Sequence, residues 1–129
     1  MNFLDTSVLV AGVLEKHPHH AASVPLLAAA DSVTDMHSLA ESFAVLTVAY
    51  KLRNLDAAAL LLDRPLAIAQ PLLPEDYRAC LEKPAMVQGK GIYDALHAAV
   101  ARRLKVETLY THNVTNFVHH ASDLNIRAP

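Results

Sequence analysis

The sequence predicts an α/β fold in which a short, mostly parallel sheet has helices on both faces. Two observations lead to this class: short apolar segments with strand character alternate with segments of helical spacing, and the helical segments are longer. Strands that alternate with helices pair in parallel, because each helix returns the chain across a face of the sheet. The length suits one continuous core, so we expect a single domain over residues 1–129.

The predicted strands are short apolar runs that end at capping or turn residues. Pro71 indicates the end of the third strand, because proline cannot donate a hydrogen bond to a neighbouring strand. The predicted strands are 3–4, 32–34, 66–72 and 107–111.

The predicted helices combine apolar residues at helical spacing with residues that favour a helix start. Thr6 or Ser7 can cap the first helix and Asp35 the third, through oxygens that accept backbone N–H bonds. Pro74 suits the first turn of the fifth helix. The predicted helices are 7–15, 19–30, 36–53, 56–63, 74–83, 92–104 and 116–124, with a loop at 88–91.

One predicted helix, 36–53, has an apolar stripe that favours burial in the core. An exposed groove for a partner protein is the alternative. The stripe consists of Leu39, Phe43, Val48 and Tyr50.

The composition excludes several classes of protein. Apolar residues make up 53% of the chain, which argues against disorder. No apolar stretch approaches the ~20 residues of a membrane span, and Asp5 together with the absence of a basic N-terminal region argues against a secretory signal. The net charge of −2 gives no basic signature for nucleic-acid binding but does not exclude it, since local charge matters more. Cys80 is the only cysteine, so we expect a reduced, cytoplasmic protein.

Three acidic residues are predicted to lie at the carboxyl edge of the sheet, where parallel sheets bind ligands. Asp5 follows the first strand, Glu41 lies early in the helix 36–53, and Asp94 lies in the first turn of 92–104. Glu41 and Asp94 have apolar sequence neighbours, among which an unpaired carboxylate is costly. A shared Mg²⁺ or Mn²⁺ would relieve this cost and the repulsion between the acids.

Each acid also has a purely structural explanation. Asp5 can cap the first helix, Asp94 complements the helix dipole, and Glu41 can be a solvated helix residue. The coincidence of three acids at one edge favours the metal site.

Four segments resemble, in chain order, the signatures of PIN-domain ribonucleases, and most closely those of VapC-type toxins from toxin–antitoxin pairs. The segments are FLDTSVLV, LAESFAVL, GIYDALHAAVA and LYTHNVTNF. The resemblance implies a PIN-like fold and an endoribonuclease in which Asp5, Glu41 and Asp94 bind catalytic Mg²⁺ or Mn²⁺. A metal of this kind supplies hydroxide near neutral pH for attack on an RNA phosphodiester. The resemblance also implies a VapB-like antitoxin partner and a homodimer, with no membrane association.

The fourth segment departs from the family pattern. Asn113 and Asn116 stand where the family often has acidic or histidine residues, which puts a second, tightly held metal in doubt. Asn113 can instead hold a metal-bound water. Thr6, Ser7 and Thr111 resemble groups that orient the carboxylates, although plain helix and turn caps are the alternative.

Basic residues and histidines supply two further hypotheses. Lys90 and His112 are candidates for RNA contacts. Eight histidines also raise the idea of a zinc site, but the chain has no H-E-x-x-H helix, and the predicted role of His97 is to pack in the core or to orient a neighbour of the metal.

Two functions of other classes remain as alternatives. The fold could be a catalytically weak RNA- or protein-binding module that has lost turnover through Asn113 and Asn116. A phosphoacceptor receiver domain is disfavoured, because it needs an adjacent acidic pair that FLDT lacks. The three glycines form neither a dinucleotide-binding fingerprint nor a phosphate loop.

Overall fold

A computed structural model describes residues 1–82 and 89–129. Its sheet has five strands in the order β3-β2-β1-β4-β5, and every neighbouring pair is parallel. This arrangement confirms the predicted fold class. The strands are β1 (Asn2–Leu4), β2 (Ser32–Asp35), β3 (Ala69–Gln70), β4 (Thr108–Tyr110) and β5 (Ile126–Arg127).

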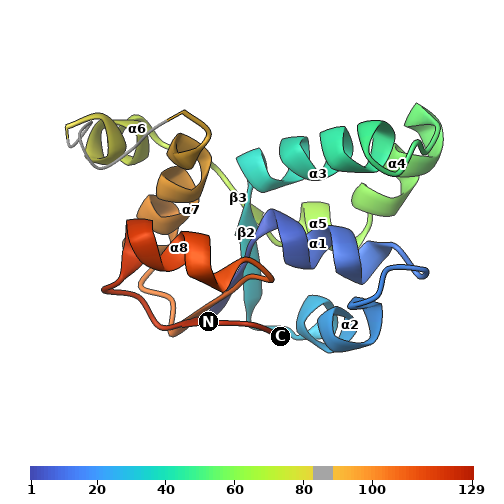
Figure 1. The fold of residues 1–129 in the computed structure, drawn as a ribbon, viewed down its shortest axis with the longest axis horizontal. Coiled ribbons are helices and arrows are strands. Elements are labelled where there is room, and N and C mark those ends of the chain that lie inside the picture. Colours follow the sequence, from blue (N-terminus) through green and yellow to red (C-terminus); the bar gives the residue numbers. More distant parts are fainter. Residues whose placement is uncertain (83–88) are drawn as a thin grey trace.

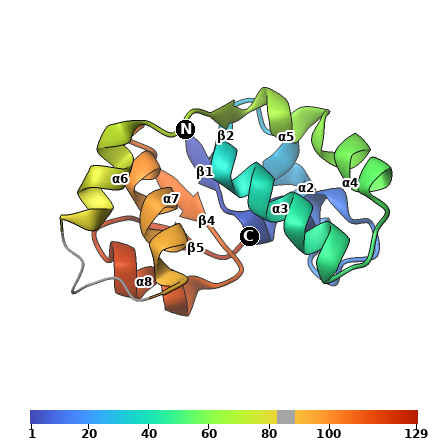
Figure 2. The same cartoon turned by 90° about the horizontal axis from the view of Figure 1, so that it is seen from above.

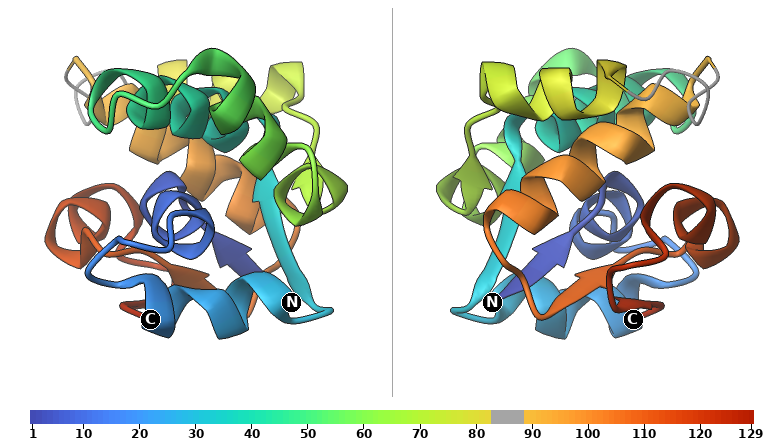
Figure 3. Two further views of the ribbon diagram at one scale, coloured as in Figure 1. Left: turned by 90° about the vertical axis from the view of Figure 1, so that its right-hand side faces the viewer. Right: turned by 90° about the vertical axis from the view of Figure 1, so that its left-hand side faces the viewer.

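Helices lie on both sides of the sheet, as Figure 1 shows, with α6 to α8 on one side and α1 to α5 on the other. Figure 2 shows the same division from above. On the second side, α1 lies between α2 and α3 (Figure 3). The helices are α1 (Thr6–Val13), α2 (His20–Ala28), α3 (Met36–Val48), α4 (Asn54–Leu61), α5 (Arg64–Ala67), α6 (Pro74–Leu81), α7 (Gly91–Arg103) and α8 (Val114–Ala121).

The central strand β1 divides the core into two faces, because successive side chains of a strand point in opposite directions. Phe3 packs in one cluster with Leu109 of β4 and Phe117 of α8. Leu4 packs in another cluster with Val8 of α1. Both faces of β1 are therefore apolar, and Asp5 is the first polar residue that follows the strand.

The segment 66–72 was predicted as one strand, and this prediction was wrong in part. Pro65 sits in the first turn of the short helix α5, where its fixed φ suits a helix start, and only Ala69–Gln70 pairs with β2. The apolar run that follows Pro65 does not itself distinguish a strand from a helical turn.

The third helix is shorter than predicted, and its apolar stripe is not wholly buried. α3 ends at Val48. Lys51, three residues later, has a positive φ of 55°, which lies outside the range of a right-handed helix. Val48 is 76% exposed and Tyr50 is 42% exposed, so the stripe enters the core only at its first part.

Smaller differences concern the last third of the chain. The helix predicted at 116–124 is α8 at Val114–Ala121, and β5 within the terminal segment was not predicted. Lys83 and Gln88, the ends of a predicted helix and a predicted loop, lie outside the described residues. No helix of the described residues is long and apolar enough to cross a membrane.

Candidate active site

Asp5 stands where β1 gives way to α1, and three hydrogen bonds hold its carboxylate. One oxygen accepts from the Ser7 backbone N–H at 3.1 Å, so Asp5 caps α1. The other oxygen accepts from the Ser7 hydroxyl at 2.9 Å and from the Thr111 hydroxyl. The residue is only 5% exposed. The carboxylate is therefore held in one orientation by Ser7 at the start of α1 and by Thr111 directly after β4.

The bonds to Asp5 continue into the loop that follows β4. The Ser7 hydroxyl accepts from the backbone N–H of His112 at 2.9 Å, and the Thr111 hydroxyl accepts from the backbone N–H of Asn113 at 3.0 Å. Because β1 and β4 are parallel neighbours, their carboxyl ends bring these residues together. The hydroxyls of Ser7 and Thr111 thus bind the Asp5 carboxylate, and Ser7 also binds the backbone that follows β4.

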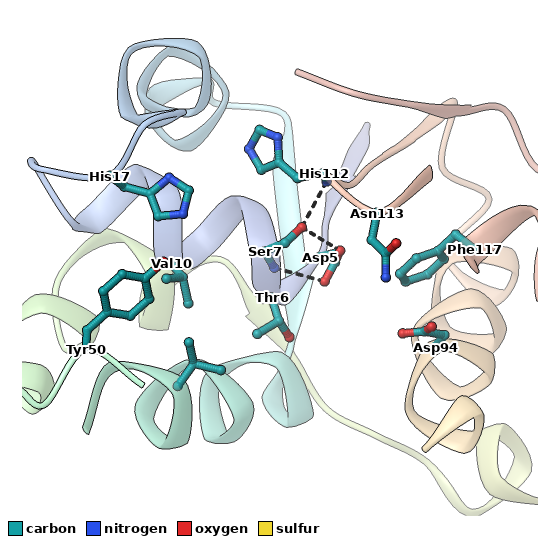
Figure 4. Close-up of a pocket in the computed structure, with 11 residues that line it drawn as sticks. Asp5, Thr6, Ser7, Val10, His17, Tyr50, Asp94, His112, Asn113 and Phe117 are labelled. Atoms are coloured by element: carbon teal, nitrogen blue, oxygen red, sulfur yellow. Dashed lines mark hydrogen bonds between the residues drawn. The ribbon is translucent and has the colours of Figure 1, made fainter. Parts of the chain in front are cut away.

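A cavity of about 280 Å³ opens beside Asp5. Figure 4 shows Asp5, Asn113 and Asp94 around one space, with Asp5 from the end of β1 and Asp94 from the first turn of α7. The cavity is lined by Asp5, Thr6, Ser7, Val10, His17, Val45, Tyr50, Asp94, His112, Asn113 and Phe117.

The electrostatics of the cavity are those of two facing carboxylates. Burial raises the pKa of Asp94 above its ordinary value, and the negative charges of Asp5 and Glu41 raise it further. The positive charges of His97 and His120 oppose this rise. A cation between Asp5 and Asp94 would reverse the repulsion, because an opposite charge within a few ångströms favours the ionised carboxylate.

The cavity also contains an unsatisfied oxygen. The Thr6 hydroxyl is buried and has no hydrogen-bond partner among the described residues. Two carboxylates, this hydroxyl and the Asn113 amide are all oxygen donors of the kind that Mg²⁺ or Mn²⁺ prefers. These residues therefore fit a hard cation, although no group of three or more acidic, histidine or cysteine side chains within the described ranges is placed to hold one.

Glu41 does not line the cavity. Its carboxylate lies 2.8 Å from Nε2 of the buried His97 and 3.1 Å from Nε2 of His37. The other nitrogen of His97 lies 2.7 Å from Asp35. Both ring nitrogens of His97 face a carboxylate, so both donate and the ring is an imidazolium. The structure thus brings Asp5 and Asp94 together, whereas Glu41 is held by His97.

The pKa values of this buried group reflect the ion pairs. Burial alone would lower the pKa of His97, but hydrogen bonds to Asp35 and Glu41 raise it to about 10. Burial would likewise raise the pKa of Asp35, yet His97 and the Ser38 N–H hold it below its ordinary range. Asp35 also caps α3, as predicted, by accepting from the Ser38 N–H at 2.7 Å.

The remaining predicted residues divide between the cavity and the surface. His112 and Asn113 line the cavity. Asn116 on α8 and Lys90 before α7 are exposed and do not line it.

The sequence did not predict five of the residues that line the cavity, and two of these five are polar. His17 lies in the loop between α1 and α2, and Tyr50 follows α3. Neither was expected at the carboxyl edge of the sheet, which was the signal used to find the acids, and Tyr50 was assigned to the core from its helical spacing.

Comparison with known proteins places the chain in a family. The family model described as PIN domain matches residues 3–119. Ribonuclease VapC27 of Mycobacterium tuberculosis is 34% identical over 112 residues, which cover 81% of this chain and 79% of that protein.

Solved structures share the fold at low identity. VapC20 of Mycobacterium tuberculosis, described as a toxin that cleaves the sarcin-ricin loop, matches with a TM-score of 0.68 and 21% identity over 84% of this chain and 87% of that one. FitAB bound to a DNA fragment matches with a TM-score of 0.71 and 18% identity over 100% and 95%. VapBC2 from Rickettsia felis, bound to a promoter DNA fragment, matches with a TM-score of 0.65 and 19% identity over 99% and 98%. With its fold, its matched range and its VapC relative in agreement, this chain belongs to the PIN domain family.

Proposed function

We propose that the chain is a metal-dependent endoribonuclease, acting as a single PIN-like domain and as the toxin component of a toxin–antitoxin pair. The observation that supports this most directly is the cavity lined by both Asp5 and Asp94, in which burial and the charge of Asp5 raise the pKa of Asp94. Membership of the PIN domain family and the identity with a ribonuclease of the VapC group support the same activity.

Asp5 and Asp94 would hold Mg²⁺ or Mn²⁺, with Asn113 and the Thr6 hydroxyl as oxygen donors to the ion or to its waters. When bound, such an ion lowers the pKa of a coordinated water and polarises a phosphoryl oxygen. We propose Glu41 as the third acid of this site on the resemblance to PIN-domain ribonucleases; its carboxylate lies 2.8 Å from His97 and does not line the cavity.

The protein's own part in the reaction is to hold these oxygens in place. Ser7 and Thr111 fix the carboxylate of Asp5, so that it does not rotate away when a phosphate approaches. Such preorganisation is the main contribution that a protein makes to phosphoryl chemistry. Lys90, exposed just before the helix that contains Asp94, is our candidate for a phosphate contact.

The partners of the proposed toxin are an RNA substrate, a VapB-like antitoxin and a second copy of the chain, and we place it in the cytoplasm. Structural neighbours that include FitAB and VapBC2 support an antitoxin partner.

The test is RNA cleavage by the purified chain in Mg²⁺ or Mn²⁺, repeated in EDTA. We expect cleavage in the presence of either metal and none in EDTA. Asp5→Asn and Asp94→Asn should each lower the rate at least about 100-fold, since even residues that only support a metal ligand affect activity 10- to 100-fold. Asparagine still caps a helix, so Asp5→Asn should fold.

Asp63→Asn is the matched control, because Asp63 is exposed, makes no capping hydrogen bond and lies outside the cavity. It should cleave at the wild-type rate. Cleavage that persists in EDTA, or that is equal in Asp5→Asn and wild type, would overturn the metal mechanism. RNA binding without cleavage in either metal would support the binding module instead.

A further inference from the structure

Three histidines and one tyrosine gather on one side of the cavity, although they come from three separate parts of the chain. The rings of His19 and His112 stack at a centroid distance of 4.5 Å with 18° between their planes. The ring of His17 lies 5.8 Å from His19 and 6.0 Å from Tyr50. We call these four residues the aromatic wall.

The aromatic wall and the acids share the same cavity. His17, His112 and Tyr50 line it together with Asp5 and Asp94. In Figure 4 the three rings lie on one side, Asp94 lies on the other, and Asp5 lies between them. A ligand that binds at the carboxylates of Asp5 and Asp94 can therefore place its adjoining part beside the rings.

One residue of the aromatic wall, His112, is hydrogen-bonded to one of the residues that hold Asp5. His112 is fixed at two points: its backbone N–H donates to Ser7, which bonds Asp5, and its ring nitrogen lies 2.9 Å from the hydroxyl of the buried Ser23. The His17 ring accepts from the backbone N–H of His19 at 3.0 Å. Hydrogen bonds thus fix the rings of His112 and His17, whereas Tyr50 is 42% exposed and meets the wall through its ring contact with His17.

The geometry favours stacking over metal binding. The rings of His19 and His112 are nearly parallel, so their in-plane nitrogen lone pairs lie side by side and do not converge on one ion, and the His17 ring is tilted by 44° from His19. Consistent with this, no metal-binding group of three or more side chains occurs in the two described ranges. Flat, partly exposed rings are instead the surface on which unpaired nucleobases stack.

We infer that the aromatic wall binds an unpaired nucleobase that adjoins the scissile phosphate of an RNA bound at the acidic site of Asp5 and Asp94. The cavity volume of about 280 Å³ is close to the lower end for small-molecule sites and suits a group of nucleotide size. A double helix keeps its bases stacked on one another, so the wall selects single-stranded RNA or a loop. This inference rests on the proposed function, because it takes RNA as the ligand.

The test compares aromatic with aliphatic replacements of similar size. Tyr50→Phe keeps a ring and Tyr50→Leu removes it, and His17→Phe and His17→Leu form a second pair in which both members lose the bond from His19. Binding of a fluorescently labelled single-stranded octaribonucleotide pool is measured by anisotropy in Mg²⁺, on Asp94→Asn chains so that the RNA is not cleaved. Each Leu variant should bind about 5- to 150-fold more weakly than its Phe partner, the range expected for one stacked base.

An abasic scan locates the contact. Each nucleotide of an octaribonucleotide of one sequence is replaced in turn by an abasic one. At one position, the replacement should weaken binding to the Asp94→Asn chain that keeps Tyr50. The same replacement should not change binding to the chain that also contains Tyr50→Leu. Equal binding by Phe and Leu variants at both sites would overturn the inference, as would an abasic effect that is the same in both chains.

The two proposals fail in different ways. If the Phe and Leu variants bind RNA equally while metal-dependent cleavage persists, only the proposed role of the aromatic wall is refuted. Absence of cleavage with a clear difference in binding leaves the wall in place and assigns it to a binding module.

Discussion

His97→Phe should strongly destabilise the fold, because His97 is a buried cation between two carboxylates. Phenylalanine preserves the ring and approximate volume, so the change removes mainly the charge and both hydrogen bonds. Asp35 is 0% exposed and would keep only its bonds from Ser38. Removing one member of a buried ion pair typically costs about 3–5 kcal/mol, because the other charge remains buried and unpaired.

The raised pKa of His97 points in the same direction as this loss. A rise from 6.5 to about 10, at roughly 1.4 kcal/mol for each pKa unit, corresponds to about 5 kcal/mol between the two protonation states. A loss of about 3–5 kcal/mol would be a large part of the roughly 5–15 kcal/mol by which domains are stable.

The assay is urea unfolding followed by circular dichroism at pH 7 in EDTA, which keeps metal from competing for Glu41. His119→Phe, a change at an exposed histidine of α8, is the control and should change the free energy of unfolding by less than about 0.5 kcal/mol. Asp35→Asn keeps the helix cap and removes the charge. The double variant Asp35→Asn, His97→Phe should lose at least about 1 kcal/mol less than the two single losses added together. A loss below about 1 kcal/mol in His97→Phe, or strict additivity, would refute the ion-pair argument.

Two further predictions concern pH and the core. Because the pKa of His97 is raised, the stability that its protonation contributes is complete below pH 6.5 and is lost as the pH rises through about 10. The urea concentration at the unfolding midpoint of the wild-type chain in EDTA should therefore decrease between pH 7 and pH 10. An equal decrease of the midpoint in His97→Phe would contradict this. Leu46→Ala, at a fully buried residue of α3, should lower the free energy of unfolding by about 2–5 kcal/mol. The control Leu55→Ala, at a residue that is 84% exposed, should lower it by less than about 0.5 kcal/mol. Similar losses at both positions would show that the assigned core is wrong.

The parts of the fold that the sequence predicts well are those with strong local signals. β1 and β4 contain adjacent apolar residues followed by a cap or a turn, β2 ends at Asp35, which caps α3, and α7 combines helical spacing with an acidic first turn. β3 and β5 each have only two residues and exist through pairing with a neighbour. Nothing in Ala69–Gln70 or Ile126–Arg127 alone demands an extended chain.

The candidate site divides in the same way. Asp5 and Asp94 were predicted from their place at the carboxyl edge of a parallel sheet, a rule that needs only the order of elements. The partner of Glu41 is His97, 56 residues away on another helix, and no local pattern reports that contact. His17, Tyr50 and His112 also meet only in the folded chain, so the aromatic wall had no signature in the sequence.

The placement of β1 between β2 and β4 has a consequence for a chain that is still being made. Asp5 emerges from the ribosome well before Thr111, which fixes its carboxylate and lies 106 residues later. Until that residue has left the exit tunnel, β1 lacks one neighbour and the acidic pocket lacks its lining from Asn113 and Phe117. The pocket is therefore assembled last, and a nascent chain truncated before β4 should contain most of the helices and none of the finished centre.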